Sequence, residues 1–280
     1  MVNSSRILVI GATGHVGGQV AAQLAAGGTR VRALARDPRS ASLPPEVEVV
    51  RGDLTDPDTL HSALDGIDAV YLTWPMLSAE IAERVVALIA EHARRIVLLS
   101  SAAVRDENHP IGRAHALIER PIAESSLEWT FLRPGGFATN TVEWASQIRA
   151  GDVVRGAYGA AAVPLLHEAD IAAVAVRALT TDGHAGAKYT LTGPAALSRI
   201  DQIAAIGEVL GRTLIWEEIS PEAAVAHMDW LPPDIARVVL STLAGFVDTP
   251  GPVTSTVRDV TGSPARDYRR WAADHVADFR

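Results

Sequence analysis

The segment Ile7-Leu8-Val9-Ile10-Gly11-Ala12-Thr13-Gly14-His15-Val16-Gly17 decides the fold of this chain. Four apolar residues run into three glycines with the spacing GxxGxxG, and a helical pattern follows. This order predicts a strand, a tight turn and the amino end of a helix, the arrangement that binds a dinucleotide pyrophosphate. Gly11 would allow the turn, Gly14 would let the backbone approach the phosphates, and Gly17 would let the helix pack closely on the strand. The phosphates would meet N–H groups at the positive end of the helix dipole.

The first 135 residues alternate between short apolar segments and amphipathic ones. We predict strands at 6–10, 30–35, 46–51, 68–72, 95–99 and 128–132, and helices at 16–26, 56–64, 78–92 and 111–125, with Asp56 as an N-cap. Short apolar strands between helices favour a parallel sheet that is covered on both faces. The predicted fold class is therefore α/β, a Rossmann-type doubly wound parallel sheet, with residues 1–135 as the dinucleotide-binding core.

The alternation becomes less regular after Pro134. The pattern predicts helices at 141–149, 171–180 and 198–210, and strands at 163–166, 188–191 and 214–217, with Asp170 capping the second of these helices. From Pro221 onward it is mostly helical. We expect residues 136–280 to complete the core and to form a smaller, mostly helical C-terminal cap over the substrate.

Composition excludes several classes of function. The 280 residues carry a net charge of −8, which argues against nucleic acid and anionic membranes as partners. The absence of cysteine excludes disulfides and thiolate catalysis, and no histidine pair has HxxxH or HxH spacing, so no metal site is expected. No apolar run is long enough for a membrane helix, and no signal-peptide core is evident. We expect a cytoplasmic monomer or homodimer that acts on a small molecule.

Two charged residues indicate which dinucleotide binds. Arg36 follows the second strand, where an acidic residue would bind the ribose hydroxyls of NAD. An arginine there favours the 2′-phosphate of NADP, although Asp37 comes next and leaves NAD open. Asp53 ends the third strand and either accepts a hydrogen bond from the adenine amino group or simply stabilises a turn.

With these motifs in place, the chain resembles the NmrA-like branch of the atypical short-chain dehydrogenases. The matching segments are Gly11–Gly17, Val31–Asp37, Gly52–Leu54, Leu132–Phe137 with Asn140, and Asp170–Ala172. The resemblance implies an NAD(P)H-binding protein in which the segment after Leu132 flanks the nicotinamide. Arg133 is expected to anchor this segment electrostatically rather than to touch the cofactor.

The chain departs from ordinary short-chain dehydrogenases at the catalytic pair. Those enzymes use a Tyr and a Lys four residues apart, but Lys188 is the only lysine here, and His115 and Glu119 occupy the two positions. Residues at i and i+4 share a helix face, so Glu119 could orient His115 and favour its imidazolium form, and His115 would serve as an acid or as a hydrogen-bond partner of the substrate. The alternative is an ordinary His–Glu pair on a helix surface. The resemblance includes reductases of quinones and dyes that carry a His–Glu pair.

The remaining candidates come from the same strand ends. Either Ser100 or Ser101 could bond a substrate oxygen, or cap a loop, and Trp74 either walls the substrate side or packs in the core. We take His115, Glu119 and Ser101 as catalytic candidates, and Trp74, Phe137 and Asn140 as substrate candidates. The predicted cofactor contacts are Gly11, Thr13, Gly14, His15, Val16, Gly17, Arg36, Asp53, Leu54, Thr73, Trp74, Pro75, Ser100, Pro134, Gly135, Gly136 and Phe137.

These residues predict an NADPH-dependent reductase of a conjugated electrophile such as a quinone, dye, enone or imine. Hydride would pass directly from the cofactor without a Tyr–Lys dyad. Two alternatives remain open, because a missing dyad also fits them. One is a regulator that senses NADP without turning it over, and the other is a non-redox isomerase or cyclase of secondary metabolism.

Overall fold

The computed structural model describes residues 5–75, 79–228 and 231–280, so the predicted start of a helix at Ser78 lies outside the described residues. The chain forms two compact units. The first unit comprises Met1–Pro134, Glu168–Leu191 and Asp259–Gly262. The second comprises Gly135–His167, Thr192–Arg258 and Ser263–Arg280.

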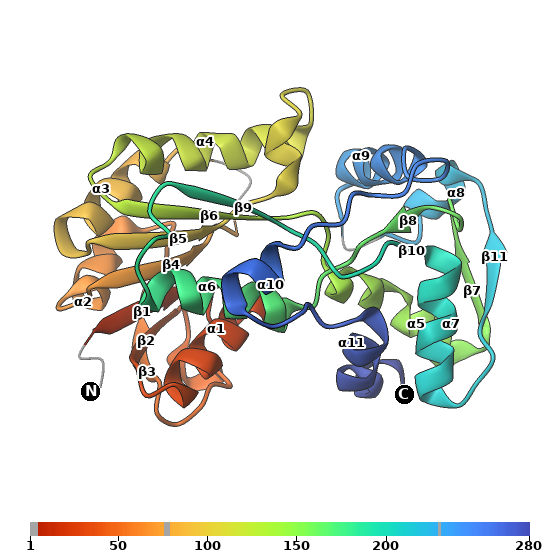
Figure 1. Ribbon diagram of the computed structural model, residues 1–280, viewed down its shortest axis with the longest axis horizontal. Helices are drawn as coiled ribbons and strands as arrows, with labels where there is room; N and C mark the ends of the chain where they lie inside the picture. Colours follow the sequence, from red (N-terminus) through yellow and green to blue (C-terminus); the bar gives the residue numbers. More distant parts are fainter. Residues whose placement is uncertain (1–4, 76–78, 229–230) are drawn as a thin grey trace. The chain divides into compact units, whose positions relative to one another are not determined.

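A seven-stranded parallel sheet forms the centre of the first unit (Figure 1). Its strands are β1 (Arg6–Ile10), β2 (Arg30–Ala35), β3 (Glu48–Arg51), β4 (Ala69–Thr73), β5 (Arg95–Leu99), β6 (Glu128–Pro134) and β9 (Ala187–Leu191). Their order across the sheet is β3-β2-β1-β4-β5-β6-β9. Strands β2 and β3 are added on one side of β1, and the later strands are added on its other side, beginning with β4. The predicted Rossmann-type α/β fold is confirmed, and the boundary between β1 and β4 is the switch point at which such sheets bind ligands.

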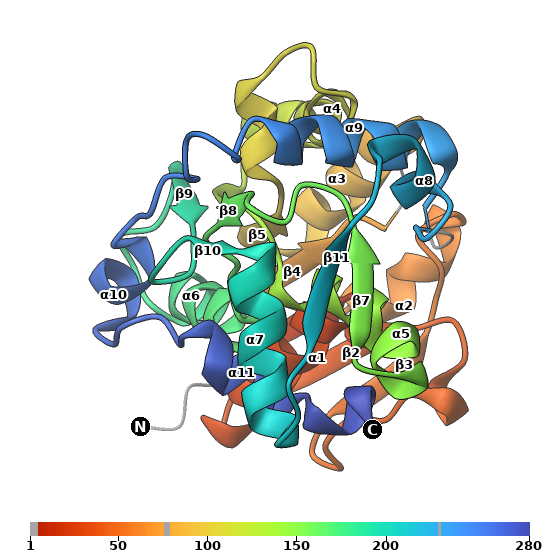
Figure 2. The same ribbon diagram turned by 90° about the vertical axis from the view of Figure 1, so that its right-hand side faces the viewer.

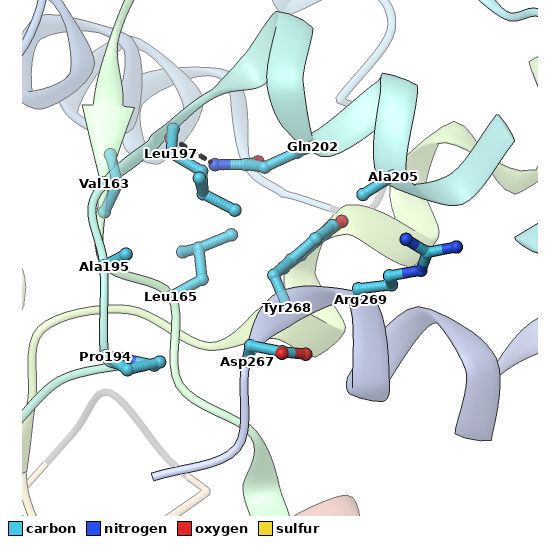
Figure 3. A pocket seen from close by; sticks show the side chains of 10 residues that line it. All are labelled: Val163, Leu165, Pro194, Ala195, Leu197, Gln202, Ala205, Asp267, Tyr268 and Arg269. Carbon is cyan, nitrogen blue, oxygen red and sulfur yellow. Dashed lines mark hydrogen bonds between the residues drawn. The ribbon is translucent and has the colours of Figure 1, made fainter. Parts of the chain in front are cut away.

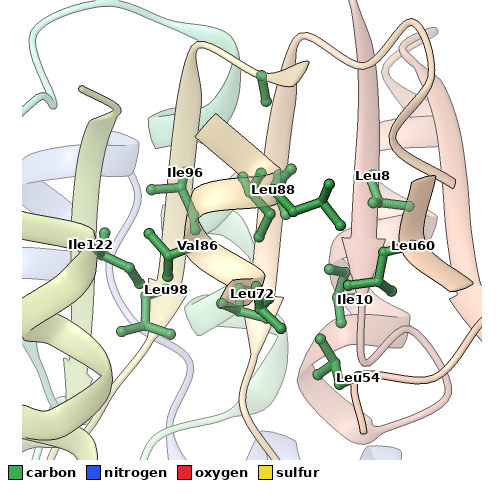
Figure 4. Packing of buried hydrophobic residues seen from close by; sticks show 14 of the residues in the cluster. Leu8, Ile10, Leu54, Leu60, Leu72, Val86, Leu88, Ile96, Leu98 and Ile122 are labelled. Atoms are coloured by element: carbon green, nitrogen blue, oxygen red, sulfur yellow. The ribbon is translucent and has the colours of Figure 1, made fainter. Parts of the chain in front are cut away.

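Helices cover both faces of this sheet, as Figure 1 shows. Helices α1 (His15–Ala26) and α6 (Glu168–Thr180) pack together on one face. The other face carries α2 (His61–Leu64), α3 (Ala82–His92) and α4 (Pro110–Glu124). The core between them consists mainly of aliphatic side chains from the strands, these three helices and the adjoining turns, with Leu72, Val86 and Ile122 among its buried members (Figure 4). Because β1, β4 and β5 are buried on both faces, they are almost continuously apolar.

The second unit contains two small sheets and several helices (Figure 2). Strands β7 (Val153–Gly156) and β11 (Ile215–Glu218) pair in parallel, and β8 (Ala162–Val163) and β10 (Leu197–Ser198) pair antiparallel. Its helices are η4 (Ala138–Trp144), α5 (Ala145–Ala150), α7 (Arg199–Leu210), α8 (Pro221–Val225), α9 (Pro233–Ala244), α11 (Tyr268–Asp274) and η5 (Val276–Phe279), while α10 (Thr256–Thr261) spans both units. Its core is rich in aromatic rings, with Trp144, Trp271 and Phe279 fully buried.

The predicted helix 56–64 differs from the observed structure. Residues Pro57–Leu60 form a 3-10 turn, η2, before the single turn of α2, and the side chain of Asp56 makes no cap bond. Instead, the Thr59 hydroxyl donates to the carbonyl of Asp56 at 2.6 Å and accepts from the Asp53 N–H at 2.9 Å. Such local side-chain bonds compete with regular helix formation.

Three further predictions need correction. Asp170 is not an N-cap, because α6 begins at Glu168 and places Asp170 inside its first turn, where the helix dipole favours a negative charge. The predicted helix 141–149 is a 3-10 segment, η4, followed by the short α5. The predicted strand 163–166 shrinks to β8, since its partner β10 offers only two residues for pairing.

Candidate active site

The glycine turn lies at the carboxyl end of β1, beside the end of β4. Gly11 has φ of +88°, which an L side chain rarely adopts, and a Cβ there would lie 2.8 Å from the Cβ of Thr73. A Cβ on Gly17 would come within 2.1 Å of the Gly11 carbonyl oxygen. The expected roles of Gly11 in the turn and of Gly17 in close packing of α1 are therefore confirmed.

Gly14 differs from the other two glycines. It precedes α1 with an extended backbone, and a Cβ there would meet only the Gly11 carbonyl oxygen at an ordinary 3.5 Å. Packing within the protein therefore does not require glycine at this position. Thr13, Gly14 and His15 are exposed at the amino end of α1, while Val16 is buried beneath them. An open helix N-terminus without a side-chain cap fits a bound phosphate group.

Arg36 and Asp37 follow β2 but have different surroundings. The carboxylate of Asp37 accepts from the Arg39 N–H at 3.1 Å and caps the 3-10 turn η1 (Pro38–Ser40). Arg36 is exposed. The side chain of Arg39 in this turn is 95% exposed and lies 3.7 Å from Asp37.

Asp53 lies in a turn after β3, next to the buried Leu54. Its carboxylate accepts from the Thr55 N–H at 2.9 Å, and this bond lowers the pKa of Asp53 below its ordinary value, with a smaller contribution from the charge of Arg36. The turn-stabilising interpretation is confirmed. The same carboxylate stays ionised and half-exposed, so it can still accept a hydrogen bond from an adenine.

Thr73, Trp74 and Pro75, at the end of β4 and just after it, have different surroundings. The Thr73 hydroxyl donates to the hydroxyl of the fully buried Tyr71 at 3.2 Å, and burial raises the pKa of Tyr71. Trp74 is only 6% exposed and belongs to the core of the first unit. This burial favours the packing interpretation of Trp74 over a substrate wall. Pro75 is exposed.

The two serines after β5 have separate partners. The buried Ser100 continues the strand pairing through its N–H, which donates to the Leu132 carbonyl at 2.7 Å, and its hydroxyl donates to Glu119 Oε1 at 2.6 Å. Ser101 caps the 3-10 turn η3 (Ala102–Arg105), because its Oγ accepts from the Ala103 N–H at 3.2 Å. The Ser101 hydroxyl is still able to donate a hydrogen bond, whereas the Ser100 hydroxyl already donates to Glu119.

Glu119 forms a buried ion pair with Arg133. The Arg133 Nε donates to Glu119 Oε1 at 2.9 Å, and its Nη2 bonds Oε2, so the pair is bidentate. Glu119 is 6% exposed, and the side chain of Arg133 is 13% exposed. The anchoring role predicted for Arg133 is confirmed, and the alternative of a His–Glu pair on the helix surface is wrong. The sequence reasoning did not connect Arg133 with Glu119, although an arginine beside a buried strand needs a counter-charge.

His115 is half-buried on α4, one turn before Glu119. Burial lowers the pKa of His115 below its ordinary value of 6.5, and the charge of Glu119 offsets only part of this effect. Glu119 does favour the imidazolium, as expected, but burial disfavours the charged form more strongly and decides the net direction. The imidazole is therefore neutral at physiological pH.

The segment after β6 carries the other predicted contacts. Pro134 is buried at the end of β6 in the first unit, and Gly135 is exposed. In the second unit, Phe137 pairs with Leu166, and Gly136 leaves room for the side chain of Leu165. Asn140 is exposed in η4.

The second unit has an apolar cavity of about 210 Å³ (Figure 3). Side chains such as Val163, Leu165 and Leu197 line it, and Tyr268 closes one side. The Tyr268 hydroxyl already donates to Thr141 at 2.7 Å. Trp74, Phe137 and Asn140 are not among the residues that line this cavity.

Comparisons with known proteins assign these features to a family. Residues 11–182 match the model of an NAD(P)H-binding family. The chain belongs to this family. The predicted resemblance to the NmrA-like, quinone-reductase-like members is confirmed.

Two curated relatives resemble the chain over nearly its whole length. The (4-alkanoyl-5-oxo-2,5-dihydrofuran-3-yl)methyl phosphate reductase of Streptomyces griseus subsp. griseus is 42% identical, with 98% of this chain and 99% of the relative covered. The NAD(P)H azoreductase of Xenophilus azovorans is 33% identical, again with 98% and 99% covered. The solved structure of the quinone oxidoreductase QOR2 of Escherichia coli, complexed with NADPH, shares the fold with a TM-score of 0.81 and 22% identity over 96% of this chain and 99% of that one.

The family and these relatives establish the enzyme class: the protein is an NAD(P)H-dependent oxidoreductase. Within the described residues, no helix has the length and apolar character needed to cross a membrane. The same part of the chain holds no cluster of three or more His, Asp or Glu side chains suited to a metal ion.

Proposed function

We propose that the protein uses NADPH to reduce a conjugated electrophile, such as an enone, a quinone, a dye or an imine, by direct hydride transfer without a Tyr–Lys dyad. One observation carries the proposal: Glu119 is committed to Arg133 and Ser100, and His115 beside it is neutral at physiological pH. Neither side chain then offers a strong acid. A conjugated electrophile needs none, because hydride addition leaves a delocalised anion that water or a weak donor can protonate.

The name of the Streptomyces relative supports this substrate class. It describes a dihydrofuran ring with an oxo group and an alkanoyl group next to the ring double bond, so the double bond is conjugated with two carbonyl groups. A hydride added to such a bond leaves its negative charge between the two carbonyls. We infer that the substrate of this chain is an acyl-activated alkene of this kind, or an acceptor of similar electron demand.

Several of the chain's residues would hold the cofactor and substrate. Gly11, Gly14 and Gly17 suit the pyrophosphate, because the turn and the helix end leave backbone rather than side chains at the surface. Arg36 would pair with the 2′-phosphate of NADPH, and Asp53 with the adenine. Further proposed cofactor contacts are Thr13, His15, Val16, Leu54, Thr73, Pro75, Ser100, Pro134, Gly135, Gly136 and Phe137.

The bound dinucleotide supplies the hydride, and the protein supplies orientation and hydrogen bonds. Ser100 offers only lone pairs to a ligand, since its proton is bonded to Glu119. Ser101 and the neutral His115 can each donate to a substrate oxygen. Phe137 and Asn140 are the proposed substrate contacts from the second unit.

The proposal is tested by titrating the protein with NADPH and NADH and then following NADPH oxidation. The acceptors are a 3-acyl butenolide, a singly activated enone, a quinone, an azo dye and an unconjugated ketone. We expect oxidation with the conjugated acceptors and very little with the ketone. Equal rates with ketone and butenolide would overturn the mechanism. NADPH binding without oxidation by any acceptor would instead favour the sensing or non-redox alternatives.

A further inference from the structure

Helix α4 is attached to its surroundings at two points on the face that carries His115. A Cβ on Gly112 would lie 2.1 Å from the Ala103 carbonyl oxygen, so this turn of α4 packs directly on the backbone of η3. Seven residues later, Glu119 is bonded to Arg133 and Ser100. Residues at i, i+3 and i+7 share a helix face, which places His115 between the two attachments.

The second attachment is built from three elements around one carboxylate. Ser100 comes from the end of β5, Arg133 from the end of β6 and Glu119 from α4, and we call these three residues the carboxylate clamp. Oε1 of Glu119 accepts from Ser100 at 2.6 Å and from Arg133 at 2.9 Å, and Oε2 pairs with the second arm of Arg133. All three side chains are largely buried, so water does not substitute for these bonds.

The clamp commits both carboxylate oxygens of Glu119 to Arg133 and Ser100. Glu119 thereby controls the place of α4 relative to the ends of β5 and β6. Ser101 and Pro134 lie at those strand ends, and His115 lies on α4.

We propose that Glu119 is a positioning residue, which acts through Arg133 and Ser100 to hold His115 at a fixed place beside the carboxyl ends of β5 and β6. The inference deepens the proposed function and rests on it for the role of His115 as a weak donor. Hydrogen-bond donation to a reacting oxygen depends steeply on distance, so a helix that shifts by about 1 Å would lower turnover by up to roughly a hundredfold. NADPH affinity should change less than turnover, since the glycine turn and Arg36 lie outside the clamp and only Ser100 and Pro134 among the proposed cofactor contacts lie in or next to it.

The test compares E119Q, R133Q and the double variant E119Q/R133Q with E124Q, which alters an exposed residue of the same helix. Each is assayed with a singly activated enone, for which protonation matters. We expect kcat to fall about ten- to a hundredfold in each single variant, with the Kd for NADPH within about twofold. The double variant should lose no more than the worse single one, because the two residues act as a unit. E124Q should match the wild type.

Two results would overturn the proposal. A general acid or base at Glu119 would remove a limb of the pH–kcat profile in E119Q while R133Q keeps it. A merely structural pair would lower the melting temperature and leave kcat of the folded protein unchanged. If E119Q alone does not fold, the double variant, which removes both charges of the pair, is measured in its place with the same assays.

The imidazole NMR signals of His115 separate this inference from the proposed function. They should shift in E119Q and R133Q and stay unchanged in E124Q, whether or not any acceptor is reduced. An inactive wild type with shifted His115 signals in the clamp variants would reject the proposed function and keep the positioning role. Unshifted His115 signals would reject the positioning role.

Discussion

Burial acts on the His115 imidazole more strongly than the carboxylate of Glu119 does, although the two residues lie one turn apart on α4. Glu119 also has partners of its own. Its charge is balanced by Arg133, and its Oε1 accepts from Ser100. His115 and Glu119 are therefore a neutral imidazole next to a charge-balanced carboxylate, rather than an acid with its orienting base. The effect of burial on His115 can be measured.

The lowered pKa of His115 makes stability depend on pH. The unfolded chain takes up the proton near the ordinary pKa of 6.5, and the folded protein does so only at lower pH. The contribution of His115 to stability is therefore fully present above 6.5 and is lost as the pH falls through the lower pKa of the folded state. Urea unfolding at about pH 8 and about pH 5.5 should show a smaller loss of unfolding free energy in H115Q than in the wild type.

The exposed His61 provides the control for this experiment, since H61Q removes a histidine without removing a buried one. Assignment of the effect to His115 requires H115Q to reduce the loss of stability more than H61Q does. An equal loss of unfolding free energy between the two pH values in the wild type and in H115Q would show that the pKa of His115 does not differ between the folded and the unfolded protein.

Replacing His115 with phenylalanine should separate substrates by their need for a proton donor. The variant keeps an aromatic ring of similar width and loses the N–H donor. Turnover of a singly activated enone should fall about a hundredfold, the usual size of a lost proton donor, and turnover of a 3-acyl butenolide by less than about threefold. The NADPH Kd should not change. Equal losses with both substrates would show that His115 acts by packing rather than by donation.

The glycines of the turn should divide into folding and binding roles. G17A should not fold stably, because its Cβ would meet the Gly11 carbonyl oxygen at 2.1 Å. G14V should fold, since the backbone there is extended and a Cβ has an ordinary contact at 3.5 Å, but it should lose dinucleotide binding by blocking the helix end. Melting temperature and NADPH titration check both results. A G14V protein that binds NADPH normally would refute the phosphate site.

Local sequence signals predicted the part of the fold that carries the cofactor. The apolar run before Gly11 and the glycine spacing depend on residues close together in the chain, so β1, β2 and β5 begin and end at the predicted residues. The sequence did not predict the 3-10 turn at Pro57–Leu60, because this turn depends on hydrogen bonds between the Thr59 hydroxyl and the backbone of Asp53 and Asp56. The spacing of apolar residues contains no information about such bonds.

The pairings within the candidate site could not be predicted from the sequence. Glu119 lies 19 residues from Ser100 and 14 from Arg133 in the chain, and only the packing of α4 on the sheet brings them together. The sign of the shift at His115 depends on the same packing, since burial and charge act in opposite directions. Gly112 was overlooked, although a glycine within a helical pattern often marks a close approach of backbones.

If the protein uses NADPH as proposed, Arg36 should be the residue that distinguishes NADPH from NADH. Asp37 uses its carboxylate to cap the turn at Arg39, which leaves Arg36 exposed at the end of β2. A charge-assisted bond to the 2′-phosphate is worth about 1.5–3 kcal/mol, so R36A should weaken NADPH binding roughly 10- to 150-fold and NADH binding far less. Fluorescence titration with both nucleotides measures the two constants.

Arg30 supplies the matched control, because it is an exposed arginine at the opposite end of the same strand. R30A changes the net charge of the protein by the same amount and should leave both nucleotide affinities within about twofold, since only long-range and screened interactions are lost. Equal weakening of NADPH and NADH in R36A would remove Arg36 from the 2′-phosphate. The exposed Arg39 would then be the next residue to replace, because its guanidinium follows the same turn.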